Sequence, residues 1–472
     1  MRRDAFDLYD HFESCNYIDP RYYERSNVKR GLRNADGSGV VAGVTNISSV
    51  HGYVLSEGDR VPCEGELTLR GYSINDLVGG TAGRGRFGYE ELAYLLLTGV
   101  LPNQQELDSF QVLIDEYRDL PKGFVNDNLL TRPSDNVMNM LARSILQLYA
   151  QDPNANSMTA KHEIDTAVML ISTMPRLAVL SYYAIQQRFY HKDMVWHPAV
   201  AGLTMAETVL DMLRPDHEYT AEEAHMLDVL LMLQAEHGGG NNSTFTCRVV
   251  TSSGTDPYSA YAAAIGSLKG PRHGGANLKV REMIKDLEAT TEDWTDEDQV
   301  AEYLRAVLNK QAYDHAGLIY GMGHAVYTLS DPRAVICHSY ASKMAAGTEF
   351  EPELRLLETI ERLTPDIIAE VKGTRKAICA NIDLYTGFVY DMLGIPEDLY
   401  TPMFATARIT GWAAHRFEEI VSGKRIIRPA YRTTLQNRAY EPLEERPAIE
   451  GFHAPESEAP SEPTSAYDAY GD

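Results

Sequence analysis

Residues 221–240 read AEEAHMLDVLLMLQAEHGGG and hold the clearest helical pattern of the chain. Their apolar side chains recur at the i, i+3, i+4 spacing that predicts a buried α-helix. The glycine triplet 238–240 follows at once, and glycine commonly ends a helix because it reaches backbone conformations that other residues avoid. We therefore predict a strongly apolar helix that ends beside His237.

The same spacing predicts helices over most of the chain from Tyr89 onward. It is present in YEELAYLLLTG (89–99), ELDSFQVLIDEYRDL (106–120), DNVMNMLARSILQLY (135–149), IDTAVMLISTMPRLAVLSYYAIQQ (164–187) and PMFATARITGWAAHRFEEIVSG (402–423). Residues 34–82 are more strand-like, and Glu64–Leu77 reads as a strand, a turn and a helix start. We predict a mainly α protein with short strands near the N-terminus.

The bulk composition excludes several classes of protein. The 472 residues suffice for a large core and two domains. A net charge of −24 disfavours nucleic acids and anionic membranes as partners. No apolar run reaches the roughly 20 residues that span a bilayer. The N-terminus shows no apolar signal segment, and the five cysteines form no CxxC pair, so we expect reduced thiols and a cytoplasmic protein.

The C-terminal end has a different composition from the rest. Residues 441–472 carry nine acidic residues and one arginine, and residues 450–472 are rich in proline, serine and glutamate. Such segments cannot bury enough apolar surface to fold, so we expect an acidic, disordered tail.

Three histidines lie in glycine-rich turns. They are His237 in EHGGGNN, His273 in GPRHGGAN and His324 in GMGHAVY. A lone histidine of this kind is more often a structural cap, but glycine beside all three favours a close approach of backbone to a ligand. Zinc would require an HExxH pair or ligands at short spacing, whereas these histidines are 36 and 51 residues apart. We therefore predict no metal site.

One carboxylate and several arginines complete the candidate set. Asp383 in NIDLYTG is a helix cap or turn residue in the ordinary interpretation, but its apolar neighbours would raise its pKa toward that of a general base. Arg333, Arg408 and Arg428 are individually typical of surface salt bridges. Together they could bind carboxylates through paired hydrogen bonds.

Taken in order, the motifs resemble those of the citrate synthase family of bacteria. They are RGYSINDL, YEELAYLLLTGVLP, HGGGNNSTF, LKGPRHGGAN, GMGHAVY with DPRA, NIDLYTG with LGIP, and FATARITGWAAH with RIIRP. The resemblance covers nearly the whole chain. It implies a mainly α, two-domain fold with the active site in the cleft between a large and a small helical domain. The large domain would comprise residues 1–274 and 389–440, the small domain residues 275–388, and the tail residues 441–472.

The resemblance also implies the substrates and a set of roles. The reaction would condense acetyl-CoA with oxaloacetate and hydrolyse citryl-CoA, without a cofactor. Asp383 would remove the methyl proton, His273 would stabilise the enol, and His324 would polarise the oxaloacetate carbonyl. The oxaloacetate- or citrate-binding residues would be His237, Arg333, Arg408 and Arg428. Ser243 and Asn241 would orient His273.

Further implications concern CoA and assembly. Asn381 and Lys376 lie where the family approaches CoA, and Arg428 would reach the site of a partner subunit in a homodimer. The chain departs from the family at Gly238, where glutamate is common, and at Ala325, where bacterial members often have arginine. The second change removes a cation near the CoA phosphates.

Two alternatives stay open from the sequence. A 2-methylcitrate synthase would use propionyl-CoA, and one extra methylene is worth only about 1–3 kcal/mol in an apolar pocket. A non-catalytic homologue would act as a binding subunit, although it would not need the retained histidines and Asp383.

Overall fold

The computed structural model describes residues 16–34, 38–56, 59–373 and 377–446, and it confirms a mainly α architecture with few strands. It divides into two units. One spans Val41–Ile427, and the other comprises the described parts of Met1–Val40 and Arg428–Asp472.

In its described residues the smaller unit contains little regular structure. The helices described there are α2 (Arg21–Arg25), η2 (Arg30–Leu32) and η7 (Leu443–Glu445), and none of the three buries a residue. Residues 447–472, which hold most of the predicted tail, lie outside the described residues.

A three-stranded antiparallel sheet opens the larger unit. Its strands, in the order β1-β2-β3, are β1 (Ser48–Ser56), β2 (Asp59–Leu69) and β3 (Tyr72–Ser73). The side chain of Ser73 then accepts a hydrogen bond from the backbone N–H of Asn75 and caps α3 (Ile74–Gly80). The strand, turn and helix start predicted for Glu64–Leu77 are therefore confirmed.

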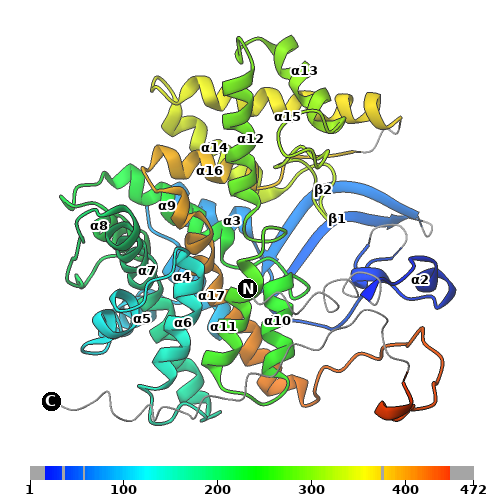
Figure 1. Cartoon of the computed structure of the whole chain (residues 1–472). Helices are drawn as coiled ribbons and strands as arrows, with labels where there is room; N and C mark the ends of the chain where they lie inside the picture. Colours follow the sequence, from blue (N-terminus) through cyan, green and yellow to red (C-terminus); the bar gives the residue numbers. More distant parts are fainter. Residues whose placement is uncertain (1–15, 35–37, 57–58, 374–376, 447–472) are drawn as a thin grey trace, which may run out of the picture. The chain divides into compact units, whose positions relative to one another are not determined.

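One group of helices surrounds α17 (Tyr400–Glu418), whose residues from Tyr400 to Arg416 are all buried. Figure 1 shows this group below and to the left of the sheet. Its other members are α4 (Tyr89–Thr98), α5 (Gln104–Glu116), α6 (Val137–Tyr149), α7 (Ala160–Tyr190), α8 (Met205–Leu213), α9 (Ala221–Gln234), α10 (Asn242–Thr251) and α11 (Pro257–Leu268). The alanine-rich helix α11 packs against α6 and α10.

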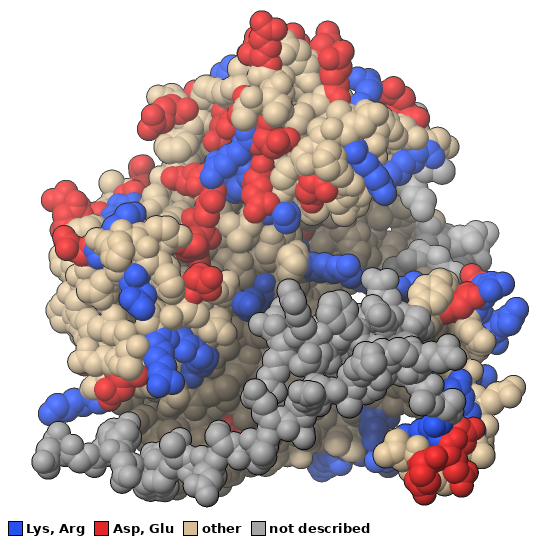
Figure 2. Space-filling model, viewed as in Figure 1, with Lys and Arg blue, Asp and Glu red and all other residues tan. Residues whose placement is uncertain are grey.

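A second group of helices packs among itself, at the top of Figure 1. Its members are α12 (Ala276–Thr290), α13 (Glu297–Leu308), α14 (Pro332–Ala345), α15 (Glu351–Lys372) and α16 (Asp383–Met392). The predicted small domain, residues 275–388, covers most of this group. Its boundaries stay a prediction. Figure 2 shows acidic side chains over this part of the surface, which includes the exposed Glu292, Asp293 and Glu297.

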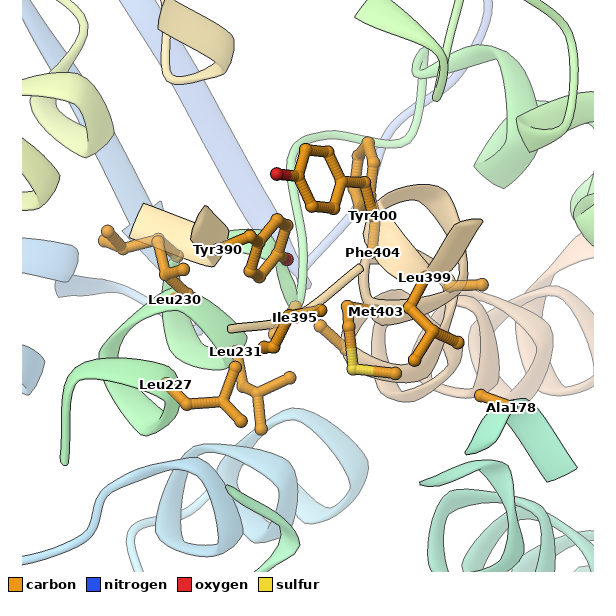
Figure 3. Close-up of a cluster of buried hydrophobic side chains, with 14 of the residues drawn as sticks. Ala178, Leu227, Leu230, Leu231, Tyr390, Ile395, Leu399, Tyr400, Met403 and Phe404 are labelled. Carbon is orange, nitrogen blue, oxygen red and sulfur yellow. The ribbon is translucent and has the colours of Figure 1, made fainter. Parts of the chain in front are cut away.

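The strongly apolar stretch that begins at Ala221 forms α9. Thr220 caps it by accepting a hydrogen bond from the backbone N–H of Glu223, whose carboxylate bonds back to the N–H of Thr220. Leu227, Leu230 and Leu231 of α9 enter a buried cluster with side chains of α16 and α17 (Figure 3). Phe404, one member of this cluster, also contacts the candidate site described below.

The long helix α7 corrects one expectation. By length and composition it could cross a membrane, so the chain does hold an apolar stretch of that size. However, 89% of its most apolar window is buried inside the protein, as in the central helix of a packed core.

The described cysteines are Cys63, Cys247, Cys337 and Cys379, and all four are free thiols. This confirms the prediction for these four, while Cys15 lies outside the described residues.

Candidate active site

His237 lies three residues after the end of α9 and is buried, with 8% of its surface exposed. Its Nε2 is 3.2 Å from the hydroxyl oxygen of Tyr327. Burial holds the pKa of His237 well below its usual range, and the charge of Arg333 lowers that pKa further. The imidazole is therefore neutral near pH 7.

His324 lies directly beside His237, although 87 residues separate the two in sequence. Their ring centroids are 5.2 Å apart, and the ring of Tyr327 stacks on His324 at 4.6 Å. The Nδ1 atom of His324 accepts hydrogen bonds of 3.1 Å from the backbone N–H groups of Val326 and Tyr327. A nitrogen that accepts such bonds carries no proton, so in the neutral ring Nε2–H is the donor.

His273 is fixed in the opposite tautomer. Its Nε2 is 2.9 Å from the hydroxyl of Ser243 and accepts a 3.3 Å hydrogen bond from the backbone N–H of Ser243. Burial, followed by the charge of Arg408, lowers the pKa of His273 to about 4. The ring is therefore neutral near pH 7, and its proton is on Nδ1.

Two further side chains hold the Ser243 hydroxyl in place. The indole Nε1–H of Trp412 donates to it at 3.2 Å, and the hydroxyl lies 3.0 Å from the amide oxygen of Asn241. Ser243 and Trp412 are fully buried. The structure thus brings the predicted orienting pair, Ser243 and Asn241, to His273.

Arg333 is 5% exposed, and Asp331 binds it through three hydrogen bonds. The backbone N–H and Nε donate to Oδ1 at 3.0 and 3.1 Å, and Nη2 donates to Oδ2 at 2.7 Å. Asp331 follows the usual pattern of a helix cap, because Pro332 begins α14. The Asp-Pro-Arg sequence therefore both starts a helix and fixes a guanidinium.

Arg408 is fully buried in the middle of α17. Its Nε donates to the backbone carbonyl of Gln234 at 2.6 Å, and its guanidinium lies 4.7 Å from the ring centroid of Phe404. Neither Nη1 nor Nη2 has a hydrogen-bond partner among the described residues. Since an unpaired buried guanidinium is costly, this pattern indicates a site for an anionic ligand.

Asp383 is the first residue of α16 and keeps part of its surface exposed. Burial raises its pKa to about 6, although the charges of Arg333 and Arg408 oppose this shift. Its backbone N–H donates to the amide oxygen of Asn381 at 3.0 Å, while the Asn381 amide nitrogen donates to the carbonyl of Gly323 at 2.9 Å. Asn381 therefore links Asp383 to the turn that holds His324.

Glu236, the residue before His237, is a buried carboxylate that contacts several groups around the site. It is fully buried, and its Oε1 accepts hydrogen bonds from Gly238 N–H at 2.7 Å, Ser48 Oγ at 2.8 Å and His415 Nε2 at 2.8 Å. Burial alone would raise its pKa, but the charge and hydrogen bond of His415, followed by the charge of Arg408, lower it to about 2. Glu236 is therefore an anion that balances the positive charge around it.

The assembled side chains can perform chemistry on a polarised carbonyl. His273 and His324 each present one N–H donor, the carboxyl group of Asp383 has a pKa of about 6, and Arg333 and Arg408 can bind carboxylates. No group of His, Cys, Asp and Glu side chains suited to hold a metal ion is present among the described residues.

Residues 35–430 match the family model described as the C-terminal domain of citrate synthase. The chain belongs to the citrate synthase family. Like the members of this family, it is an enzyme of the acyltransferase type.

The relatives of this citrate synthase family member fall into two named activities. The citrate synthase of Haloferax volcanii is 33% identical over 89% of this chain and 99% of its own length. The 2-methylcitrate synthase 1 of Corynebacterium glutamicum is 29% identical over 89% of this chain and 99% of its own length. Sequence similarity therefore does not separate the two activities.

Solved citrate synthase structures also resemble this chain. The citrate synthase of Thermoplasma acidophilum, in a ternary complex with carboxymethyl coenzyme A and oxaloacetate, has a TM-score of 0.71 to this chain at 25% identity. That similarity covers 88% of this chain and 99% of the archaeal one. It confirms the predicted citrate-synthase-like fold.

Two further site residues were predicted for this family member, Arg428 and Lys376. Arg428 is exposed and begins the second segment of the smaller unit. Lys376 lies outside the described residues. Their roles stay predictions.

The sequence interpretation missed four members of the cluster: Tyr327, Asp331, Glu236 and Trp412. Tyr327 and Asp331 had a signal, since they lie in the same quoted motif as His324 and Arg333. Trp412 had the same kind of signal, since it lies with Arg408 in the quoted motif FATARITGWAAH, but its partner Ser243 is 169 residues away.

Proposed function

We propose that the protein condenses acetyl-CoA with oxaloacetate and hydrolyses the resulting citryl-CoA to citrate and CoA. The observation that carries this proposal is the combination of two neutral imidazoles, each fixed by backbone N–H donors, with a carboxylate whose pKa is about 6. Deprotonation of a thioester methyl group requires both parts. A base must remove the proton while a donor stabilises the charge that develops on the carbonyl oxygen.

In this proposal Asp383 is the base and His273 the donor. The Nδ1–H of His273 donates to the thioester oxygen while the Asp383 carboxylate takes a methyl proton. The resulting enol then attacks the ketone of oxaloacetate. A neutral imidazole suits this role, because it stabilises an enol without the desolvation cost of burying a second charge.

Oxaloacetate occupies the other half of the site. The Nε2–H of His324 polarises its ketone, and Arg408 and Arg333 bind its carboxylates, with His237 as a further contact. The two unpaired nitrogens of Arg408 support this role, because a carboxylate would satisfy both of them. Arg428 of a second subunit would complete the set in a homodimer.

A nearly equal likeness to 2-methylcitrate synthases keeps propionyl-CoA as a second candidate substrate. The test is the oxaloacetate-dependent release of CoA thiol from acetyl-CoA and from propionyl-CoA. We expect a higher kcat/KM with acetyl-CoA. An equal or higher value with propionyl-CoA would reassign the protein to 2-methylcitrate synthesis, and no release with either substrate would refute the proposed chemistry.

A further inference from the structure

The hairpin formed by β1 and β2 touches both of the segments that carry the oxaloacetate-side histidines. Its lower part, around Ser48 and Val50, contacts residues 236–238. Its middle part, around Gly52 and Gly65, contacts residues 326–332. Figure 1 shows the two long strands side by side to the right of the helices.

The first contact fixes the backbone around His237. The hydroxyl of Ser48 donates to the Glu236 Oε1 atom at 2.8 Å, and the same oxygen accepts the N–H of Gly238 at 2.7 Å. The Glu236 side chain thus bonds to the backbone on the far side of His237 and fixes the turn that holds this histidine. Gly238 has a φ of +90°, and a Cβ atom there would lie 3.1 Å from a methyl carbon of Val50. The Val50 side chain of β1 therefore packs closely against this turn.

The second contact fixes the segment after His324. The N–H of Gly65 donates to the hydroxyl of Ser330 at 3.1 Å, and that hydroxyl donates to the carboxylate of Glu64. A Cβ atom at Gly65 would lie 2.7 Å from Cδ1 of Tyr327. Tyr327 in turn stacks on His324 and lies within hydrogen-bond distance of His237.

Gly52 makes the same kind of approach from the neighbouring strand. A Cβ atom there would lie 2.7 Å from the carbonyl oxygen of Val326 and 3.0 Å from Cα of Tyr327. Neither Gly52 nor Gly65 has the positive φ that would explain a glycine by backbone conformation. Close packing against the segment after His324 is therefore the reason that both positions hold glycine.

We propose that the β1–β2 hairpin is a template that sets the relative placement of His237 and His324, with Ser48, Gly52 and Gly65 as positioning residues. The hairpin contacts both the turn that holds His237 and the segment that follows His324, and Tyr327 of that segment contacts both histidine rings. A misplacement of about 1 Å in such a site costs up to about 100-fold in rate. The kinetic test of this inference rests on the proposed function, whereas the binding test does not depend on it.

The test compares three glycine-to-alanine variants. Gly65→Ala and Gly52→Ala place a methyl group against the segment after His324, whereas Gly43→Ala is the matched control, since a Cβ atom at Gly43 meets nothing within 4 Å. Circular dichroism and the unfolding midpoint establish that each variant is folded. We expect the first two variants to lower kcat about 10- to 100-fold and to weaken oxaloacetate binding in titration calorimetry, with the control unchanged.

A milder variant keeps the inference testable where Gly65→Ala does not fold. Ser330→Ala removes the partner of the Gly65 N–H without adding bulk, and we expect it to lower kcat/KM for oxaloacetate by about tenfold. Folded Gly52→Ala and Ser330→Ala variants that bind oxaloacetate and turn over like Gly43→Ala would overturn the inference. If the wild type releases no thiol but these variants still weaken oxaloacetate binding, the proposed reaction fails and the template stands.

Discussion

Asp383 shows how one residue acquires a catalytic pKa from its surroundings. Burial raises the pKa of its carboxyl group to about 6, and the positive charges of Arg333 and Arg408 keep this pKa from rising further. Without those arginines, a buried carboxyl could be protonated at neutral pH and could not accept a proton. The arginines thus bind the substrate in our proposal and also keep the base ionised.

The variant Asp383→Asn should remove proton abstraction while it leaves oxaloacetate binding near normal, since the amide keeps the shape of the carboxyl group. We expect kcat to fall by about 10²- to 10⁴-fold. In the wild type the base must be ionised. Therefore kcat/KM should decline as the pH falls below about 6 and level off above it. A fully active Asp383→Asn variant would show that another group is the base.

For individual residues, the sequence predicted which side chains form the site but not their tautomers or hydrogen-bond partners. Glycine beside three histidines indicated a ligand site, and apolar neighbours of Asp383 indicated a raised pKa. The tautomers could not be predicted, because they depend on hydrogen bonds from backbone N–H groups, such as that of Ser243 to His273 across 30 residues. Glu236 looked like an ordinary helix-end residue until the fold placed His415 against it.

Among the elements, α9 carries both an apolar core face and a buried carboxylate. Asp228 accepts hydrogen bonds from the backbone N–H groups of Gly88 at 2.7 Å and Tyr89 at 3.1 Å, at the start of α4. It is fully buried, and burial followed by the charge of Glu90 raises its pKa well above the usual range. A residue of one helix therefore caps another, which local sequence patterns cannot reveal.

Replacement of this cap should affect stability strongly. Asp228→Ala leaves two buried N–H groups unpaired, at about 1–3 kcal/mol each, so we expect a loss of about 2–6 kcal/mol. Asp228→Asn keeps one acceptor and should lose less. The exposed Glu222 of the same helix provides the control, because Glu222→Ala should change stability by at most about 0.5 kcal/mol. Urea unfolding measures all three, and equal stability of Asp228→Ala and Glu222→Ala would contradict the capping role.

The helices themselves were largely predictable, because their apolar residues recur at helical spacing and become buried in the core. The predictions for α4, α5, α6, α9 and α17 are confirmed as elements. The predicted break at the glycine triplet 238–240 is confirmed too, although α9 ends at Gln234. Periodicity does not predict which helices pack against one another, and the site depends on that packing.

Across the whole molecule, a net negative charge coexists with a site that binds anions in our proposal. The chain carries a net charge of −24, and acidic side chains gather on the upper part of the face shown in Figure 2. The positive charge of the site comes instead from buried arginines, Arg333 and Arg408. Buried charges are screened weakly by salt, so the site can bind dianions despite the overall charge.

Subunit mixing tests the proposed dimer and the role of Arg428. Arg428→Ala and Asp383→Asn should each be nearly inactive alone. In a hybrid dimer one site would combine an intact Asp383 with the intact Arg428 of the other subunit. Refolding an equal mixture should therefore restore about a quarter of the wild-type activity. No recovery in mixtures that sedimentation shows to be dimeric would mean that Arg428 does not cross between subunits.

The central claim is that this site forms a carbon–carbon bond between the methyl carbon of a thioester and a ketone. The most direct measurement is the mass of the product from oxaloacetate and acetyl-CoA that is ¹³C-labelled in both acetyl carbons. The wild type should give citrate that carries both labelled carbons, whereas Asp383→Asn should give at most about a hundredth as much in the same time. Thiol release from the wild type without labelled citrate would contradict the central claim, because the protein would then hydrolyse the thioester without condensation.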